Sequence, residues 1–241
     1  MIDIHCHILH GVDDGPSTIE QSLRMVEEAE KLGISVIIAT PHYHENVYNV
    51  DRVKENYQEL LFKAQDYEVA IKIGFEVFIN PFDPAIAANS GRLTLGRTRQ
   101  MLFEFPFSVK LTHCFEAINR LQLENIIPVI AHPERNRNFL NNFRGLVAFV
   151  KAGCMIQVDA ASVTGVYGSR VKDFAKQLIK MNLVDMVASN AHYAEDYTNW
   201  YMEAYKNVIR WSGQHYAHKL FYRNAKNMLD GLEEKLYKVI G

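Results

Sequence analysis

Residues 5–14 read HCHILHGVDD, so three histidines and two aspartates are crowded into ten positions. Grouping imidazole and carboxylate side chains is unfavourable unless they bond to one another or to a bound ion. Imidazole nitrogens and carboxylate oxygens together are common ligands of first-row divalent metals. This segment therefore suggests a metal site whose other ligands come from elsewhere in the chain.

Five further short motifs carry histidine or glutamate: TPHYH (40–44), GFEVF (74–78), LFEF (102–105), AHPER (131–135) and SNAH (189–192). A single histidine of this kind is more often a hydrogen-bonded structural residue than a ligand. Taken together, the motifs give a mixed imidazole and carboxylate set that is large enough for two or three divalent ions. The candidate ligands are His5, His7, Asp14, His42, Glu76, Glu104, His132 and His192.

Apolar runs rich in β-branched residues alternate with amphipathic stretches along the chain. Strands are predicted at 1–5, 34–40, 69–78, 100–105, 126–131, 154–160 and 184–189. Helices are predicted at 18–32, about 51–66, 112–124, 138–152 and 168–182, and after about 198. Strands that alternate with helices are typical of parallel βαβ units, and this number of units favours a closed or nearly closed α/β barrel.

The candidate ligands fall at or just after the carboxyl ends of these predicted strands. In a βα barrel those ends form the rim that carries the active site, so the ligands are expected to converge. His5 and His7 are two positions apart on a strand and share a face, whereas Cys6 is expected to pack against the helices. Asp13 is expected to orient its loop. Surface or capping roles are expected for His10, His44, His113, His215 and His218.

The composition narrows the class of protein. The 241 residues are 48% hydrophobic and 22% charged, which suits one domain spanning 1–241. The net charge is only −2, so nucleic acid and an anionic membrane surface are not expected partners. The N-terminus lacks a basic and apolar leader, and no apolar run could span a bilayer, so we expect a cytoplasmic protein without membrane insertion. Three scattered cysteines do not form a disulfide framework.

The motifs DIHCHILHGVDDGP, ATPHY, GFEVFI, LFEFPF, VIAHPERN and ASNAH occur in this order over nearly the whole chain. Together they resemble the PHP (polymerase and histidinol phosphatase) superfamily, and within it the manganese-dependent tyrosine-protein phosphatases of Gram-positive capsule and exopolysaccharide operons. The resemblance implies a distorted (β/α)7 TIM-like barrel, the PHP fold, with three divalent metal ions. Mn²⁺ is the metal that the resemblance favours, and the ligand chemistry also suits Fe²⁺, Co²⁺ or Zn²⁺.

The resemblance also implies how the ligands are shared among three ions. The first ion is bound by His5, His7, Glu76 and position 190, the second by Glu76, Glu104 and His132, and the third by Asp14, His42 and His192. Water that bridges two such ions loses a proton near neutral pH and can attack phosphorus in line. Arg135 of the HPER motif is expected to stabilise negative charge on the phosphate. Arg137 either assists or only solvates a loop.

Position 190 departs from the pattern of this group. Its members carry aspartate after the last strand, whereas VASNAH carries Asn190. An amide oxygen can coordinate a metal, but it is neutral and cannot accept a proton from metal-bound water. Asn190 is therefore expected to weaken metal binding at the first site and to reduce activity. Natural divergence and an introduced substitution both account for an asparagine here.

The string HCFEAINR (113–120) also fits the His-Cys-x5-Arg pattern of thiol-dependent tyrosine phosphatases. That mechanism needs a loop of backbone N–H groups around the phosphate, built from small residues. Here the intervening residues contain no glycine, include Glu116, which would repel phosphate, and continue as an amphipathic helix. Cys114 is therefore interpreted as a helix residue and not as a nucleophile.

Three functional hypotheses follow. The leading one is a metal-dependent protein-tyrosine phosphatase whose substrate is a phosphotyrosine-containing bacterial tyrosine kinase that controls capsular or exopolysaccharide synthesis. The second keeps the same chemistry but acts on a small phosphomonoester such as histidinol phosphate. The third, suggested by Asn190 alone, is a catalytically weakened metal-binding regulatory module.

Overall fold

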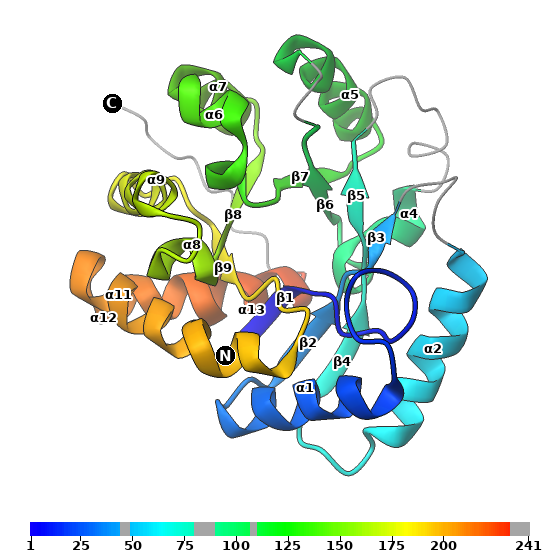
Figure 1. The fold of residues 1–241 in the computed structure, drawn as a ribbon. Helices are drawn as coiled ribbons and strands as arrows, with labels where there is room; N and C mark the ends of the chain where they lie inside the picture. Colours follow the sequence, from blue (N-terminus) through cyan, green and yellow to red (C-terminus); the bar gives the residue numbers. More distant parts are fainter. Residues whose placement is uncertain (44–48, 80–89, 107–109, 232–241) are drawn as a thin grey trace.

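The computed structural model describes residues 1–43, 49–79, 90–106 and 110–231, with strands in the centre and helices around them (Figure 1). The strands are β1 (Ile2–Cys6), β2 (Val36–Ala39), β3 (His42–Tyr43), β4 (Ala70–Ile73), β5 (Glu76–Phe78), β6 (Gln100–Glu104), β7 (Ile127–Ile130), β8 (Met155–Asp159) and β9 (Met186–Ala188). The strand pairs are parallel, in the orders β1-β2-β4 and β3-β5-β6-β7-β8-β9.

These two sheets are parts of one distorted barrel. β2 resumes as β3 after Pro41, because proline lacks the N–H that a strand ladder needs. β4 resumes as β5 after Gly74 and Phe75, and the register of the pair continues from Ala39↔Ile73 to His42↔Glu76. The described strands therefore form seven barrel positions. This confirms the predicted α/β barrel.

The barrel closes where the first strand meets the last. β1 lies between β2 and β9 (Figure 1), and Cys6 forms a parallel bridge with Ala191. The Asn190 N–H donates to the His5 carbonyl at 2.9 Å, and the His7 N–H donates to the Ala191 carbonyl at 2.9 Å. The N-terminal histidines are thereby held directly against the segment that carries Asn190.

The helices cover the outside of the barrel. The longer ones are α1 (Ile19–Lys31), α2 (Val50–Lys63), α5 (Leu111–Leu123), α7 (Phe143–Lys151), α9 (Ser169–Lys180) and α11 (Met202–Ser212). Shorter helical segments are α4 (Ser90–Leu93), η1 (Leu95–Arg97), η2 (Pro133–Arg135), α6 (Arg137–Asn141), α8 (Ala160–Thr164), α10 (Ala194–Asp196), η3 (Tyr197–Tyr201), α12 (Gln214–His218), η4 (Lys219–Arg223) and α13 (Asn224–Leu229). Within the described ranges, no helix is long and apolar enough to cross a membrane.

The helix signals of the sequence are found in the structure, with one difference. α1 begins at the TIEQ capping box, in which the Thr18 side chain and Gln21 cap each other's backbone, and Gly33 follows the helix at φ 73°. The single helix predicted over 138–152 is two helices, α6 and α7. The chain breaks at Asn142, whose side chain accepts the Gly145 N–H and so caps a new helix.

Apolar side chains fill the barrel below its carboxyl rim. The interior cluster takes residues from most barrel strands and is closed by helical residues: Ile2, Ile4, Ile38, Leu95, Leu102, Val129, Ala131, Met186, Ala188, Ala225 and Met228. A second and larger apolar cluster lies between the strands and the helices. Because the interior is filled with hydrocarbon below, polar side chains are concentrated at the strand ends above it.

β1 contains one irregularity that the sequence pattern does not show. Asp3 pairs with Ile37 and Cys6 with Ala39, so β1 has one more residue than β2 over this interval. The extra residue lets Ile4 join the interior apolar cluster while His5 joins the polar cluster at the rim. Cys6 is fully buried in the outer cluster, where it accepts the Tyr197 hydroxyl at 3.2 Å. Cys6 is therefore a packing residue, as predicted.

Candidate metal centre

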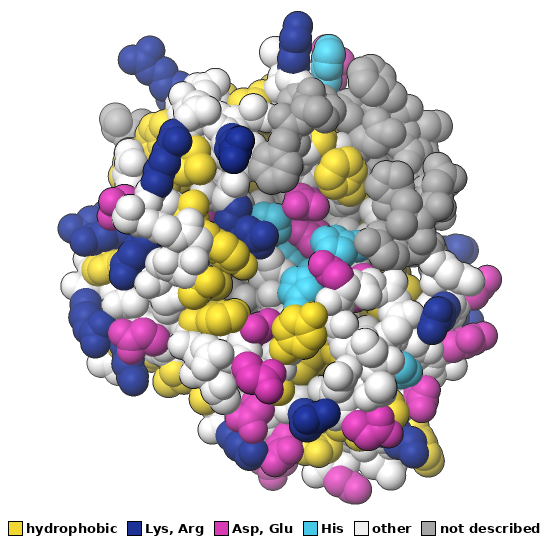
Figure 2. Space-filling model, viewed as in Figure 1, with side chains coloured by type: hydrophobic (Ala, Val, Ile, Leu, Met, Phe, Trp, Pro, Cys, Tyr) yellow, Lys and Arg dark blue, Asp and Glu magenta, His cyan; other side chains and the backbone are white. Residues whose placement is uncertain are grey.

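Histidine and carboxylate side chains gather in a hollow at the centre of the face shown in Figure 2, beside cationic and apolar side chains. Three overlapping groups of possible ligand atoms lie within 4.8 Å of one another: His5, His7 and Glu76; His42, Glu76 and Glu104; and His7, Asp14, His42 and His192. The structure thus brings together residues from strands that are far apart in the sequence, at the carboxyl rim where they were predicted.

Glu76 is the centre of the cluster. Its carboxylate is 1% exposed and is surrounded by four imidazoles. One oxygen, Oε2, lies 3.3 Å from His5 Nε2, 3.3 Å from His7 Nε2 and 3.1 Å from His42 Nδ1. The other oxygen, Oε1, lies 2.8 Å from His132 Nε2. A buried carboxylate is stable only when it is paired in this way, and its two oxygens could each hold a divalent ion.

His132 lies on the opposite side of Glu76 from His5, His7 and His42. The resemblance implies that it shares an ion with Glu76 and Glu104; the group of close ligand atoms around these two glutamates contains His42. His132 approaches the other oxygen of Glu76 and adopts φ 29°, a positive value that is uncommon for residues other than glycine. Backbone strain of this kind is found at sites where the position of a side chain is fixed by its surroundings.

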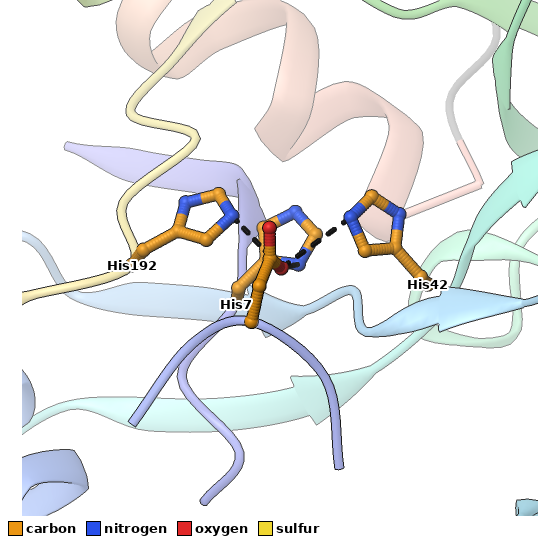
Figure 3. Close-up of side chains that lie close together, drawn as sticks. His7, His42 and His192 are labelled. Carbon is orange, nitrogen blue, oxygen red and sulfur yellow. Dashed lines mark ion pairs between the residues drawn. The ribbon is translucent and has the colours of Figure 1, made fainter. Parts of the chain in front are cut away.

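Asp14 holds the outer side of the cluster. Its Oδ1 lies 3.2 Å from His192 Nε2, 3.5 Å from His42 Nε2 and 4.0 Å from His7 Nδ1. The rings of His7, His42 and His192 lie close together in Figure 3. The His7 and His192 rings are stacked with their centroids 4.2 Å apart. Asp14, His42 and His192 could hold an ion nearer to solvent than the one beside Glu76, because 65% of the Asp14 side chain is exposed.

Hydrogen bonds at Nδ1 leave Nε2 of three histidines directed into the cluster. His7 Nδ1 lies 2.8 Å from Asp13 Oδ2, His5 Nδ1 lies 3.1 Å from Gln157 Oε1, and His192 Nδ1 lies 3.0 Å from the Asn190 carbonyl. Each acceptor favours the tautomer that is protonated at Nδ1, so Nε2 keeps its lone pair. This arrangement is the usual one for imidazoles that bind metals. Asp13 also accepts the His42 and Gly15 N–H groups, and so orients the loop as predicted.

The charges of the cluster shift the pKa values of its members in opposite directions. Burial would lower the pKa of His7, but Asp13 and Glu76 raise it to about 9. Burial would likewise lower the pKa of His42, but Asp14 and Glu76 raise it to about 11. Burial would raise the pKa of Glu76, but the surrounding imidazoles hold it well below its usual value. A metal ion held by these imidazoles would compete with protons for them.

Arg135 and Asn190 meet at Asp159, the last residue of β8. The Arg135 guanidinium donates to Asp159 Oδ2 at 2.9 Å, and the Asn190 amide donates to the same oxygen at 3.1 Å. Arg135 also lies over the Tyr167 ring, 4.5 Å from its centroid. Burial would lower the pKa of Arg135, but Asp159 raises it; burial would raise the pKa of Asp159, but His132 and then Arg135 lower it. Both groups are therefore ionised.

Two observations fit a metal ion at this site. His5 Nε2 and His7 Nε2 lie 3.2 Å apart, which is about the separation of two ligands on one ion when metal–nitrogen distances are about 2.1 Å. The Asn190 Oδ1 atom is buried and accepts no hydrogen bond among the described residues. A cation would satisfy both the paired lone pairs and this amide oxygen. The donor set, mixed imidazole and oxygen, suits divalent ions such as Mn²⁺.

The remaining candidates lie outside the cluster. Cys114 is fully buried on α5, and burial raises the pKa of its thiol to about 11, so the thiol-phosphatase pattern is excluded as predicted. His10 pairs with Glu59 at 3.4 Å. His113 lies on α5, His215 and His218 are exposed on α12, Arg137 is exposed at the start of α6, and His44 falls outside the described residues.

Gln157 and Asp159 belong to the site but were missed by the sequence analysis. Both are fully buried at the carboxyl end of β8 and share a face, two positions apart, as His5 and His7 do on β1. The same rule of strand ends and alternation could have found them. It was not applied because glutamine and a single aspartate do not by themselves suggest a metal site.

A parallel α/β barrel with a histidine and carboxylate cluster at its carboxyl rim is the architecture of a metal-dependent hydrolase. The family described as capsular polysaccharide synthesis, CpsB/CapC, matches residues 1–230. The chain belongs to this family, as the resemblance implied.

Individual relatives agree with this assignment. The tyrosine-protein phosphatase YwqE of Bacillus subtilis (strain 168) is 37% identical over 197 residues, covering 80% of this chain and 77% of that protein. The tyrosine-protein phosphatase CpsB of Streptococcus agalactiae serotype III (strain NEM316) is 29% identical over 238 residues, covering 95% of this chain and 98% of that protein. A crystal structure from a study of YwqE of B. subtilis and CpsB of Streptococcus pneumoniae, described as unique metal-dependent tyrosine phosphatases, superimposes with a TM-score of 0.88 at 34% identity. It covers 97% of this chain and 96% of that one.

Proposed function

We propose that this chain is a metal-dependent protein-tyrosine phosphatase that hydrolyses phosphotyrosine on a bacterial tyrosine kinase controlling capsular or exopolysaccharide synthesis. The observation that carries the proposal is the Glu76 carboxylate at the centre of four imidazoles, in a family whose relatives bear the name tyrosine-protein phosphatase. We propose that residues 1–241 form one PHP domain. The proposed cofactors are three divalent ions, with Mn²⁺ preferred over Fe²⁺, Co²⁺ or Zn²⁺.

The proposed ligands are those that the resemblance implies. His5, His7, Glu76 and Asn190 hold the first ion; Glu76, Glu104 and His132 hold the second; and Asp14, His42 and His192 hold the third. The overlapping ligand groups support the first and third sets directly. The second set is supported by the Glu76 carboxylate, whose Oε1 faces His132 while its Oε2 faces His42.

Bound divalent ions supply an activated water and positive charge against the phosphate oxygens. The residues of this chain position the reaction. Asp13, Gln157 and the Asn190 carbonyl fix imidazole orientations, and Arg135 offers a planar guanidinium to the phosphate. Phenolate is a good leaving group, since its conjugate acid has a pKa of about 10, so no strong general acid is required.

Substrate competition tests the proposal against the second hypothesis. The manganese-loaded protein should hydrolyse a phosphotyrosine peptide with a kcat/KM at least about tenfold above that for histidinol phosphate, because differences of this size follow from modest differences in transition-state contacts. A reversed ratio would assign the site to small phosphomonoesters. Binding of the phosphopeptide with turnover no faster than in buffer would identify a regulatory module, which Asn190 suggests.

Arg135→Ala should lower kcat for phosphotyrosine by about 10²-fold, with unchanged metal content, because the guanidinium is a preorganised charge that is not a metal ligand. Turnover and metal per chain, by elemental analysis, would be measured together. Arg144→Ala, an exposed arginine on α7, is the matched control and should retain parental kcat. A parallel loss of metal and turnover in Arg135→Ala would show that Arg135 is structural.

A further inference from the structure

We propose that Asp159 is the positioning residue of this centre: its carboxylate sets the orientation of Arg135, of the Asn190 amide and, through Gln157, of the His5 imidazole. The proposal rests on the proposed metal centre and adds a residue that touches neither metal nor substrate. Asp159 is fully buried at the end of β8, and its backbone N–H is held by Glu134 Oε1 at 2.9 Å. Its position is therefore fixed by the strand.

The Asp159 carboxylate is the acceptor in each of its three side-chain hydrogen bonds. A carboxylate only accepts, and three donors surround this one: Arg135 Nη1 at 2.9 Å and Asn190 Nδ2 at 3.1 Å on Oδ2, and Gln157 Nε2 at 2.9 Å on Oδ1. Either end of an amide can usually face a neighbour, but next to a carboxylate only the NH₂ end is favourable. Asp159 thereby determines which atoms Asn190 and Gln157 turn away from it.

At Asn190 the atom turned away is Oδ1, the buried oxygen without a hydrogen-bond donor. The amide is held in place from the backbone side as well, because Asn190 adopts φ 50° and its N–H donates to the His5 carbonyl. Asp159 therefore presents a carbonyl oxygen, and not an NH₂ group, as the free atom of residue 190. An NH₂ group in its place would repel a cation.

At Gln157 the atom turned away is Oε1, which lies 3.1 Å from His5 Nδ1 and 3.3 Å from the His132 N–H. Because this oxygen accepts, His5 must carry its proton on Nδ1, which leaves the Nε2 lone pair on the cluster side, 3.2 Å from His7 Nε2. The order Asp159, Gln157, His5 is thus a relay in which each hydrogen bond fixes the next.

Asp159→Asn tests the relay, because asparagine has the same shape but only one oxygen for three donors. If that oxygen faces Arg135 and Asn190, its NH₂ group faces the NH₂ group of Gln157. Gln157 then either loses this hydrogen bond or turns, in which case it gives up the His132 N–H and presents its own NH₂ to His5. The affinity for Mn²⁺, measured by calorimetric titration of metal-stripped protein, should fall by about 10- to 100-fold, the usual effect of losing a partner behind a ligand. The signal of the His5 Nδ1–H proton in nitrogen-15 spectra of the zinc-saturated protein should be lost.

Two further variants separate this role from charge and from stability. Gln157→Met breaks the relay without changing charge, and should also weaken Mn²⁺ binding and remove the His5 signal. Asp185→Asn is the matched control: Asp185 is a buried carboxylate that accepts the Ile156 N–H at 2.7 Å at the other end of β8, and its loss should leave both readouts unchanged.

Parental Mn²⁺ affinity and an intact His5 signal in both Asp159→Asn and Gln157→Met would overturn the relay. An effect of Asp159→Asn without one of Gln157→Met would reduce Asp159 to a source of negative charge, and would overturn its action through Gln157. A parental protein that binds no Mn²⁺ at all would instead contradict the proposed metal centre itself.

Discussion

Removing divalent metal should abolish hydrolysis of phosphotyrosine by this protein, and adding Mn²⁺ should restore it. The reason is that the rim of the barrel offers imidazole and carboxylate groups but no described nucleophilic side chain among the cluster residues. Without an ion to acidify water, no group in the cluster can supply hydroxide at neutral pH. The measurement is turnover of a phosphotyrosine peptide after dialysis against a chelator, followed by titration with Mn²⁺.

Cys114→Ser is the control for the competing thiol mechanism. A serine in place of a buried helical thiol should leave turnover within about twofold of the parent, because burial raises the pKa of the Cys114 thiol and the residue packs in the outer apolar cluster. Full activity in the presence of chelator, or loss of activity in a folded and metal-loaded Cys114→Ser variant, would contradict a metal-dependent mechanism.

Glu76→Gln should lower kcat by at least about 10³-fold, which is more than the rate lost with a single preorganised charge. It should also remove part of the bound metal. Glutamine has nearly the same shape, so the apolar interior should be undisturbed. It is neutral, however, and it cannot offer an anionic oxygen on each side at the point where His5, His7, His42 and His132 converge. Metal per chain and kcat at saturating Mn²⁺ are the two measurements.

Asp185→Asn again provides a matched variant, since it neutralises a buried carboxylate outside the cluster and should retain both metal and turnover. Glu76→Gln protein that keeps its full metal content and parental kcat would remove Glu76 from the centre of the site. Full metal content with low kcat would show that Glu76 acts on the reaction and not on metal retention.

The sequence predicted the barrel and most of the rim because both depend on short-range patterns. Strand and helix periods locate the carboxyl ends of strands, and parallel topology then brings those ends together. His5, His42 and Glu76 were placed by this rule alone, and the His42↔Glu76 register shows why it holds: each residue lies at the same height on neighbouring strands.

What the sequence did not predict depends on geometry between strands. The extra residue in β1, which places Ile4 inside the barrel and His5 at the rim, is visible only against the register of β2. Asp159 is similar: its role follows from three donors that reach it from β8, η2 and the segment after β9. Nothing in the local sequence VDAAS states that Arg135 and Asn190 are its neighbours.

Closure of the barrel between β1 and β9 has a consequence for the protein during its synthesis. Cys6 and Ala191, which pair at the seam, are 185 residues apart in the chain. At a translation rate of about 5–20 residues per second, roughly 10 to 40 seconds separate their synthesis. His5 and His7 are therefore made well before their neighbours Asn190 and His192. The centre therefore cannot be complete in a nascent chain until residues 190–192 have been made, and a metal ion that needs all of these ligands could be fully bound only after that point.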